Sequence, residues 1–388
     1  MKTYLCENKN ASGMKIALED MILTKEYPTT AGSKMLEGFV SLFDAEVVEK
    51  LTSAGYEIGG KVNVGEFAID LLGETSYFDG LDDDFVSATS KVIADGDAYA
   101  VVGLDVNGAQ RRAAAISGQV NVKPTYGTVS RFGTIPVACS GECVSITADS
   151  VNKCRLVLSA VAGHDDKDGT SLSDENIGLI KADADFTPAK KVAVIKGVNT
   201  ENVCDILKNS GVEVEEIDAD TFIAAKTAWN ILMSAELCNN VSRYDGVKFG
   251  YRSENYKTIG ELYTNSRSEA FGEVLKTAIL YGSDALSTEN YFKVYDKALR
   301  IRRVMCEKFA EIFKNFDAII MPAVSKEKYE KADVESNKLF CFDENVYTAP
   351  ASISGLPVVT AGGVQIVGKA FSENVLFALA EVLEKEGK

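Results

Sequence analysis

The sequence predicts an α/β fold, in which strands and helices alternate along the chain. Short apolar runs with strand character alternate with stretches that have the three-to-four-residue spacing of an amphipathic helix. The clearest example is a strand at 192–195, a helix at 200–209 and a second strand at 212–217. Such alternation places helices on both faces of a sheet. With 388 residues, 46% of them hydrophobic, the chain has enough apolar material for a large core.

The amino-terminal part of the sequence contains one strand pattern and one well-defined helix pattern. The apolar run that starts at Met14 ends in the acidic pair Glu19 and Asp20, so we expect a strand that leads into a polar loop. A short helix is expected at 33–38. In the segment 44–55, apolar residues at three-to-four spacing predict an amphipathic helix that is ended by a glycine.

Longer helices are expected in the carboxyl-terminal half. Helical patterns occur at 226–243, 296–314 and 372–384, and the apolar run 318–321 predicts a buried strand. The sequence has no internal repeat, low-complexity tract or linker that would divide the chain. It therefore predicts a single domain over residues 1–388.

The formal net charge of −16 predicts a soluble, self-repelling surface. Such a charge disfavours contact with a phosphate backbone, so direct nucleic-acid binding is not expected. The basic first half of 296–314 is interpreted as a solvated helix face for the same reason. The sequence has no apolar run of about 18 residues and no signal-peptide pattern, which predicts a cytoplasmic protein that does not enter a membrane.

Cysteine and acidic residues form no pattern typical of a metal site. Eight cysteines are scattered along the chain and are expected to be reduced thiols in or near the core. Only Cys139 and Cys143 lie close together in sequence, and the chain has one histidine, so zinc is not expected. The acidic segment 215–220 is expected to be a solvated strand end. We therefore predict neither a metal nor a cofactor.

Several separate blocks of the sequence resemble one known family. The segments 123–127 (KPTYG), 129–133 (VSRFG) and 162–168 (AGHDDKD) resemble the amidase signature family. Within that family, segments 244–252 and 266–272 resemble the A subunits of the glutamyl-tRNA(Gln) amidotransferases. The blocks occur in the family's order, and the resemblance extends from near the amino terminus to the carboxyl end.

The resemblance implies one α/β/α domain with a large mixed sheet sandwiched between helical layers. In the family, helices normally precede the first strand, and this sequence lacks them. The surface that those helices cover would then face a partner or carry compensating polar residues.

The family's catalytic residues are replaced in this sequence. The family uses a Lys-Ser-Ser triad, and the resemblance aligns Glu19 with the lysine, Phe85 with the bridging serine and Ala109 with the nucleophile. Phe85 and Ala109 are 24 residues apart (109 minus 85), the separation expected between the two serines of the family. Lys61 does not align with the catalytic lysine, and we expect it to support a strand and the following turn.

The surrounding cleft is partly retained. Family residues are kept at Asp105, Gly108, Arg111 and Lys123. In the substrate pocket, the resemblance aligns Ala278 with an arginine and Asn345 with an aspartate. The carboxylate of free glutamine would then have no cationic partner.

These replacements remove the chemistry that the family uses. An alanine methyl group cannot attack a carbonyl carbon, and a phenylalanine would fill the space that the proton relay needs. A glutamate cannot replace the lysine in that relay, although it could act as a general base toward water. The hydroxyls of Ser87, Thr89 and Ser90 lie nearby in sequence, and one of them could substitute for the bridging serine, but serines at a helix start more often cap the helix or face solvent.

The sequence leaves three functional hypotheses open. The first is a non-catalytic paralogue that binds a B-like or C-like subunit, another protein or a small-molecule ligand. The second is an A subunit of an amidotransferase, or an amidase, with rearranged chemistry, in which Glu19 activates water or Ser87 is the nucleophile. The third is a different enzyme that uses Glu19, Asp105, Arg111 or Lys123.

Overall fold

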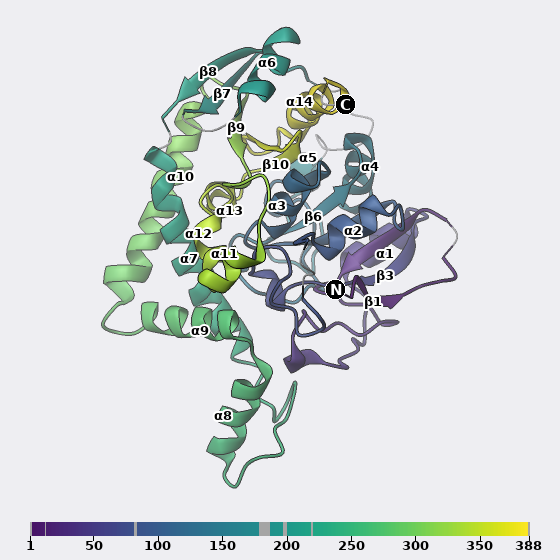
Figure 1. Ribbon diagram of the computed structural model, residues 1–388, viewed down its shortest axis with the longest axis vertical. Coiled ribbons are helices and arrows are strands. Elements are labelled where there is room, and N and C mark those ends of the chain that lie inside the picture. The colour runs from purple at the N-terminus through teal and green to yellow at the C-terminus, as the bar shows by residue number, and fades with distance from the viewer. Residues whose placement is uncertain are drawn as a thin grey trace.

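The computed structural model describes residues 2–11, 13–80, 84–177, 187–196, 200–218 and 220–386. These residues form an 11-stranded mixed sheet with helices on both faces, in the order β1-β3-β2-β4-β6-β5-β10-β11-β9-β7-β8 (Figure 1). The predicted α/β/α architecture is therefore confirmed. The strands are β1 Tyr4–Glu7, β2 Lys15–Glu19, β3 Glu57–Val62, β4 Ala100–Asp105, β5 Val120–Lys123, β6 Cys143–Ala148, β7 Lys191–Ile195, β8 Glu213–Ile217, β9 Ala318–Pro322, β10 Val358–Ala361 and β11 Val364–Gly368.

Helices connect the strands and cover both faces of the sheet. Two short helical turns, Lys34–Leu36 and Glu66–Ala68, lie near the amino terminus, and a π-helical turn, Tyr291–Tyr295, precedes α10. The helices are α1 Glu46–Ser53, α2 Ala88–Ala94, α3 Ala109–Ile116, α4 Val151–Val161, α5 Asp174–Ile177, α6 Glu201–Asn209, α7 Asp220–Val241, α8 Ile259–Ala270, α9 Glu273–Ala285, α10 Asp296–Ile312, α11 Lys331–Ser336, α12 Phe340–Glu344, α13 Ala349–Ser354 and α14 Glu373–Glu386.

The side chains of each strand alternate between two apolar cores, because successive residues of a strand point to opposite faces. In β7, Val192 and Val194 join a core with α1, α4, α6 and α14. Their neighbours Ala193 and Ile195 face α7, α10 and α13 instead. Strands buried on both faces read as continuous apolar runs, which is why β7 and β9 could be predicted from the sequence.

Some predicted elements differ from those observed. The helix expected at 33–38 is a single turn, Lys34–Leu36, and Gly38 after it has a positive φ of 77°. The helix expected from Lys226 begins at Asp220. Thr200 precedes α6 as expected, but its side chain does not accept a capping hydrogen bond from that helix.

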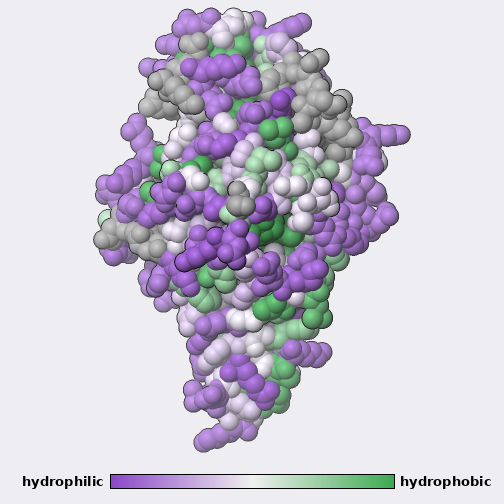
Figure 2. Space-filling view, turned by 90° about the vertical axis from the view of Figure 1, so that its right-hand side faces the viewer, coloured by the Kyte–Doolittle hydropathy of each residue, from purple (hydrophilic) through white to green (hydrophobic). Residues whose placement is uncertain are grey.

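The molecule is elongated, and its body tapers toward α8. Figure 1 shows α8 projecting from the lower end of the domain, beyond α9. In Figure 2 the side of the molecule near β1 and α1 is largely hydrophilic, with apolar side chains gathered along one edge of the narrow end. The hydrophilic character of this face agrees with the net charge of −16.

Candidate functional site

The sheet brings together Glu19 and Ala109, two of the three residues that the resemblance aligns with the family's triad. Strands β2 and β4 are parallel neighbours, so their carboxyl ends meet at the same edge of the sheet. Glu19 is the last residue of β2, and Ala109 is the first residue of α3, which follows β4. The turn between β4 and α3 requires Gly108, because its φ is 84° and a Cβ there would overlap the side chain of Thr348.

Glu19 and Ala109 line a small cavity, which we call the triad cavity. Its volume of about 20 Å³ is enough for a single water molecule and too small for an amide substrate. No lysine lines it among the described residues. The lining residues are Glu19, Asn63, Val64, Gly65, Ala68, Asp70, Leu72, Gly73, Ser87, Ala88, Thr89, Leu104, Ala109, Gln110 and Ala113.

The Glu19 carboxylate is buried, with 6% of the residue exposed. Burial raises its pKa to about 7, although the amide of Gln110, the backbone N–H of Leu104 and the hydroxyl of Thr89 each lower it in part. The Thr89 hydroxyl donates at 3.2 Å and the Leu104 N–H at 3.3 Å. Glu19 therefore changes its charge near neutral pH, as a general base must.

Phe85 packs beside the triad cavity rather than inside it. Its ring belongs to an apolar cluster with Leu71, Leu72, Ala113 and the more distant Tyr329 and Cys341. The backbone of Phe85 has a positive φ of 51°, which is uncommon for a residue with a side chain. The ring does not line the cavity itself, but its cluster neighbours Leu72 and Ala113 do. That the ring fills the space of the relay stays a prediction.

Among the hydroxyls near the triad cavity, that of Ser87 caps α2. Ser87 is the N-cap residue of that helix, and its oxygen accepts a hydrogen bond from the Ser90 N–H at 3.1 Å. Its own hydroxyl donates to Ser90 Oγ at 3.1 Å. The capping role expected for serines at this position is confirmed for Ser87.

Two buried lysines lie outside the triad cavity. Lys61 donates to the carbonyl of Ile22 and to Thr29 Oγ1, the latter at 3.0 Å, and its Nζ is 3.5 Å from Asp20 Oδ1. It thus holds the loop after β2, whereas from the sequence we expected it to support its own strand, β3, and the turn after that strand. Lys123 Nζ lies 3.8 Å from Cys143 Sγ, and burial lowers the pKa of Lys123.

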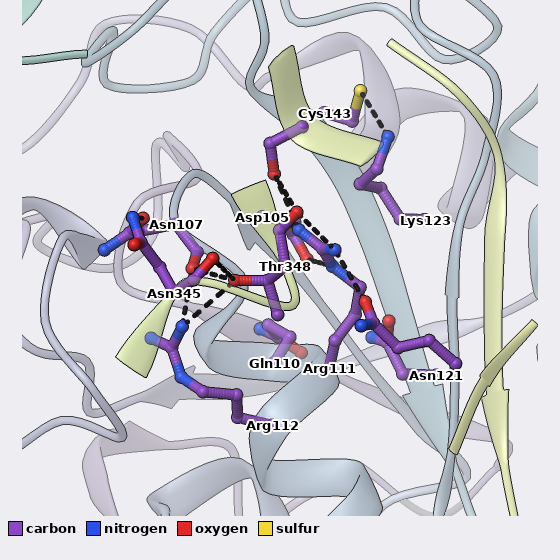
Figure 3. Close-up of polar contacts among 12 residues, drawn as sticks. Asp105, Asn107, Gln110, Arg111, Arg112, Asn121, Lys123, Cys143, Asn345 and Thr348 are labelled. Carbon is purple, nitrogen blue, oxygen red and sulfur yellow. Dashed lines mark hydrogen bonds and ion pairs between the residues drawn. The ribbon is translucent and has the colours of Figure 1, made fainter. Parts of the chain in front are cut away.

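Arg111 and Asp105 form a fully buried ion pair beneath the start of α3 (Figure 3). Two nitrogens of the guanidinium contact the two carboxylate oxygens at 2.8 and 2.9 Å. Further hydrogen bonds from Arg111 reach Gln365 Oε1 at 2.8 Å and Ser352 Oγ at 2.7 Å. Burial raises the pKa of Asp105, but the Arg111 guanidinium outweighs burial and leaves the pKa below its usual value. The guanidinium of Arg111 therefore donates its hydrogen bonds to groups of the protein and is not available to bind a ligand.

Ala278 and Asn345, which the resemblance aligns with the substrate pocket, lie at or behind a second cavity. Ala278, on α9, lines a cavity of about 400 Å³ that shares no lining residue with the triad cavity. Asn345 is fully buried and donates from Nδ2 to Asn107 Oδ1 at 2.7 Å and to Asn230 Oδ1 at 2.6 Å. Asn230 in turn lines the second cavity. Ala278 and Asn345 therefore lie apart from the cavity that Glu19 and Ala109 line.

Glu215, from the acidic segment, and two arginines of α10 form ion pairs within the protein. Glu215 contacts Lys191 at 2.7 Å, and in the described ranges no group of three histidine, cysteine or acidic residues could hold a metal ion. On α10, Arg300 pairs with Asp296 and Arg303 with Glu307, at 2.7 and 2.8 Å. No helix among the residues described is long and apolar enough to cross a membrane.

Comparison with known proteins identifies the family. The family model named Amidase matches residues 6–377. The chain belongs to this amidase family. It is 32% identical to the A subunit of the glutamyl-tRNA(Gln) amidotransferase of Lachnoclostridium phytofermentans, over 96% of this chain and 83% of the relative. The corresponding protein of Latilactobacillus sakei is 34% identical over the same shares of the two proteins.

Solved structures of the amidase family agree with the fold. The crystal structure of the A subunit of the Thermotoga maritima glutamyl-tRNA(Gln) amidotransferase has a TM-score of 0.79, with 24% identity, 99% of this chain covered and 87% of that chain covered. The urea amidolyase of Kluyveromyces lactis also has a TM-score of 0.79, with 20% identity over 96% of this chain and 23% of that much longer one. These similarities show the fold of the chain.

Sequence reasoning missed two residues of these sites. Gly103, on β4, has no room for a Cβ, because Gln110 and Glu19 pack against it. Asn230 joins Asn345 to the second cavity. A polar asparagine on the apolar face of a long helix is the signal that could have identified Asn230, since a buried amide needs hydrogen-bond partners.

Proposed function

We propose that this chain is a non-catalytic member of the amidase family, related to the amidotransferase A subunits, that acts by binding a partner protein or a small ligand. The observation that carries the proposal is Ala109 at the first position of α3, inside a cavity of about 20 Å³. The resemblance places the family's nucleophilic serine at this position, and a methyl group has no lone pair with which to attack an amide.

The surroundings of Ala109 support the same proposal. Acyl transfer also requires a proton acceptor linked to the nucleophile and space for the substrate carbonyl. Glu19 hydrogen-bonds to Thr89 and Leu104 rather than to a nucleophile, and Ser87 caps α2. The cavity holds about one water molecule. Binding by the intact fold requires none of these catalytic groups.

A second candidate function is amide hydrolysis with rearranged chemistry, by an amidase or as the A subunit of an amidotransferase. The relatives favour it, because proteins 32% and 34% identical to this chain carry the amidotransferase designation. A local observation also favours it: Glu19 has a pKa of about 7 and faces a cavity with room for one water molecule. A glutamate with such a pKa is suited to remove a proton from water at neutral pH. The cavity would have to widen for an amide to reach that water.

The partner in the first proposal follows from the same relatives. They are designated A subunits, so each is one component of a larger assembly. A B-like or C-like subunit is therefore the first partner to test, by co-purification with the tagged chain. A small ligand is the other candidate, and the cavity of about 400 Å³ is large enough to hold one.

Steady-state ammonia release separates the two functions. Purified protein is incubated with glutamine, asparagine and simple primary amides, beside a heat-denatured sample and the L. sakei relative as a positive control. Release no faster than in the denatured sample supports the non-catalytic proposal. Release that disappears in Glu19→Gln or in Ser87→Ala, each shown to be folded by circular dichroism, supports the rearranged chemistry and rejects the first proposal.

A further inference from the structure

We infer that the second cavity is a binding site for a small uncharged molecule with an apolar body and one hydrogen-bonding group. This inference rests on the proposed binding function and names the class of ligand. We call the cavity the α7–α9 pocket. It is lined by Lys226, Thr227, Asn230, Ser234, Thr277, Ala278, Tyr281, Asn337, Leu339, Phe342 and Asp343.

The floor of the α7–α9 pocket is rigid because its two helices are in close contact. At Gly282 on α9, an added Cβ would overlap the backbone of Ser234 on α7, so only a glycine permits this approach. The segment that includes α12 forms one wall, with Leu339 and Phe342. The volume of about 400 Å³ lies within the range of pockets that hold small molecules.

One buried hydroxyl in the pocket lacks a partner. Ser234 is 1% exposed, and its Oγ has no hydrogen-bond partner in the part of the chain that the structure describes. The neighbouring amide of Asn230 is not available as that partner, since it donates to the Phe342 carbonyl at 2.8 Å and accepts from Asn345. Leaving a buried hydroxyl unpaired costs free energy, which a ligand with a donor or acceptor at this position would recover.

The charges of the pocket neutralise each other. Lys226 and Asp343 are the two charged residues among its described lining, and Lys226 Nζ contacts Asp343 Oδ1 at 3.0 Å. The other carboxylate oxygen accepts from Asn337 Nδ2 at 3.1 Å. A charged ligand would lose its hydration without finding an unpaired opposite charge, and this loss is expensive. An uncharged ligand avoids that cost.

The remaining walls suit an apolar body. Ala278, Leu339 and Phe342 present hydrocarbon groups, and Tyr281 adds a ring on a residue that is 43% exposed. Aromatic and aliphatic walls with few polar groups bind ligands mainly through buried apolar surface. An aromatic or branched carboxamide fits this description, whereas the zwitterion of a free amino acid does not.

A set of four probes of similar size tests the charge preference. Benzamide is uncharged, benzoate is an anion, benzylamine is a cation and phenylalanine is a zwitterion at neutral pH. Binding to the whole chain is measured by ligand-observed NMR and by titration calorimetry. We expect benzamide to bind at least about tenfold more tightly than each of the other three. Equal or tighter binding of a charged probe would overturn the inference, and so would binding of all four weaker than about 10 mM.

Three variants locate the binding. Thr227→Trp, at an exposed position on the pocket rim, is expected to abolish benzamide binding while the fold is retained. Ser234→Ala is expected to weaken it about three- to tenfold, the loss of one hydrogen bond. Ser53→Ala, on the exposed end of α1, is the matched control and should leave binding unchanged. Unchanged binding in both Thr227→Trp and Ser234→Ala would reject this pocket as the site.

The same samples distinguish failure of this inference from failure of the proposed function. Ammonia released from benzamide by the wild-type protein would reject the non-catalytic proposal and leave the charge preference intact. If the four probes bind with equal affinity and no ammonia is released, the inference about the ligand is rejected and the non-catalytic proposal is not.

Discussion

The Thr89 hydroxyl donates to the Glu19 carboxylate across 3.2 Å, inside a cavity of about 20 Å³. The contact joins the start of α2 to the end of β2, at the point where the amidase family is expected to carry its lysine. On that alignment, a buried acid would occupy the place of the family's lysine. This exchange, and the packing around it, can be tested by measurements of stability.

Glu19→Gln should stabilise the protein above neutral pH. Burial raises the pKa of Glu19 from 4.5 to about 7, so the folded state holds this proton more tightly than the unfolded state. Protonated Glu19 contributes fully to the stability of the fold below pH 4.5. This contribution is lost as the pH rises through the folded-state pKa of about 7. The free energy of unfolding of the variant, relative to that of the wild type, should therefore rise by up to about 3 kcal/mol when the pH is raised from about 4 to about 8. Urea unfolding at both pH values measures this, and a difference that does not change with pH would contradict it.

Gly103→Ala should destabilise the fold. The new Cβ would collide with the side-chain ends of Gln110 and Glu19, which are both buried. Overpacking of this kind costs about 1–3 kcal/mol. Thermal unfolding is the measurement. Gly169→Ala is the matched control, because its Cβ would meet no atom within 4 Å, and its stability should stay within about 0.5 kcal/mol of the wild type.

Arg111→Met should be among the most damaging single changes. It removes the guanidinium from a fully buried pair and leaves Asp105 without its two contacts at 2.8 and 2.9 Å. Loss of one partner of a buried ion pair costs about 3–5 kcal/mol. The exposed pair of Arg303 and Glu307 provides the comparison, and Arg303→Ala should cost at most about 1 kcal/mol. Equal losses of stability in the two variants, measured by urea unfolding, would show that the buried pair is not structural.

Ser87→Ala should weaken α2. The hydroxyl caps the helix by accepting from the Ser90 N–H, and replacing such a cap by alanine costs about 0.5–2 kcal/mol. Denaturant unfolding measures the loss, with Ser53→Ala on the surface of α1 as the control. A Ser87→Ala variant as stable as the wild type would mean that the cap contributes nothing.

Much of the fold could be predicted because burial leaves a pattern in the sequence. The apolar runs of β7 and β9 and the periodicity of α1 follow directly from which residues face a core. Edge strand β1 was missed, since its side chains are only partly buried and its pairing with β3 involves distant residues. Periodicity reports that a residue is buried but does not say which residue it contacts.

The site could be located from the sequence but not described in detail. Glu19 and Ala109, which the resemblance aligns with two positions of the triad, line one cavity, because one ends a strand and the other begins the helix after the neighbouring parallel strand. The resemblance could not predict that Phe85 packs in a cluster with Leu71 and Leu72 or that its backbone has a positive φ of 51°. The contact of Asn345 with Asn230 also joins distant segments, as their separation of 115 residues shows.

The central claim is that the protein does not hydrolyse amides, and a single-turnover experiment tests it most directly. Glutamine labelled with nitrogen-15 in its side-chain amide is mixed with an equal concentration of the wild-type protein and followed by NMR. Because protein and substrate are equimolar, even one turnover per molecule is visible. A non-catalytic protein leaves the amide signal unchanged relative to a protein-free sample. Loss of that signal with formation of labelled ammonium would contradict the claim, and its dependence on Glu19 would identify the rearranged base.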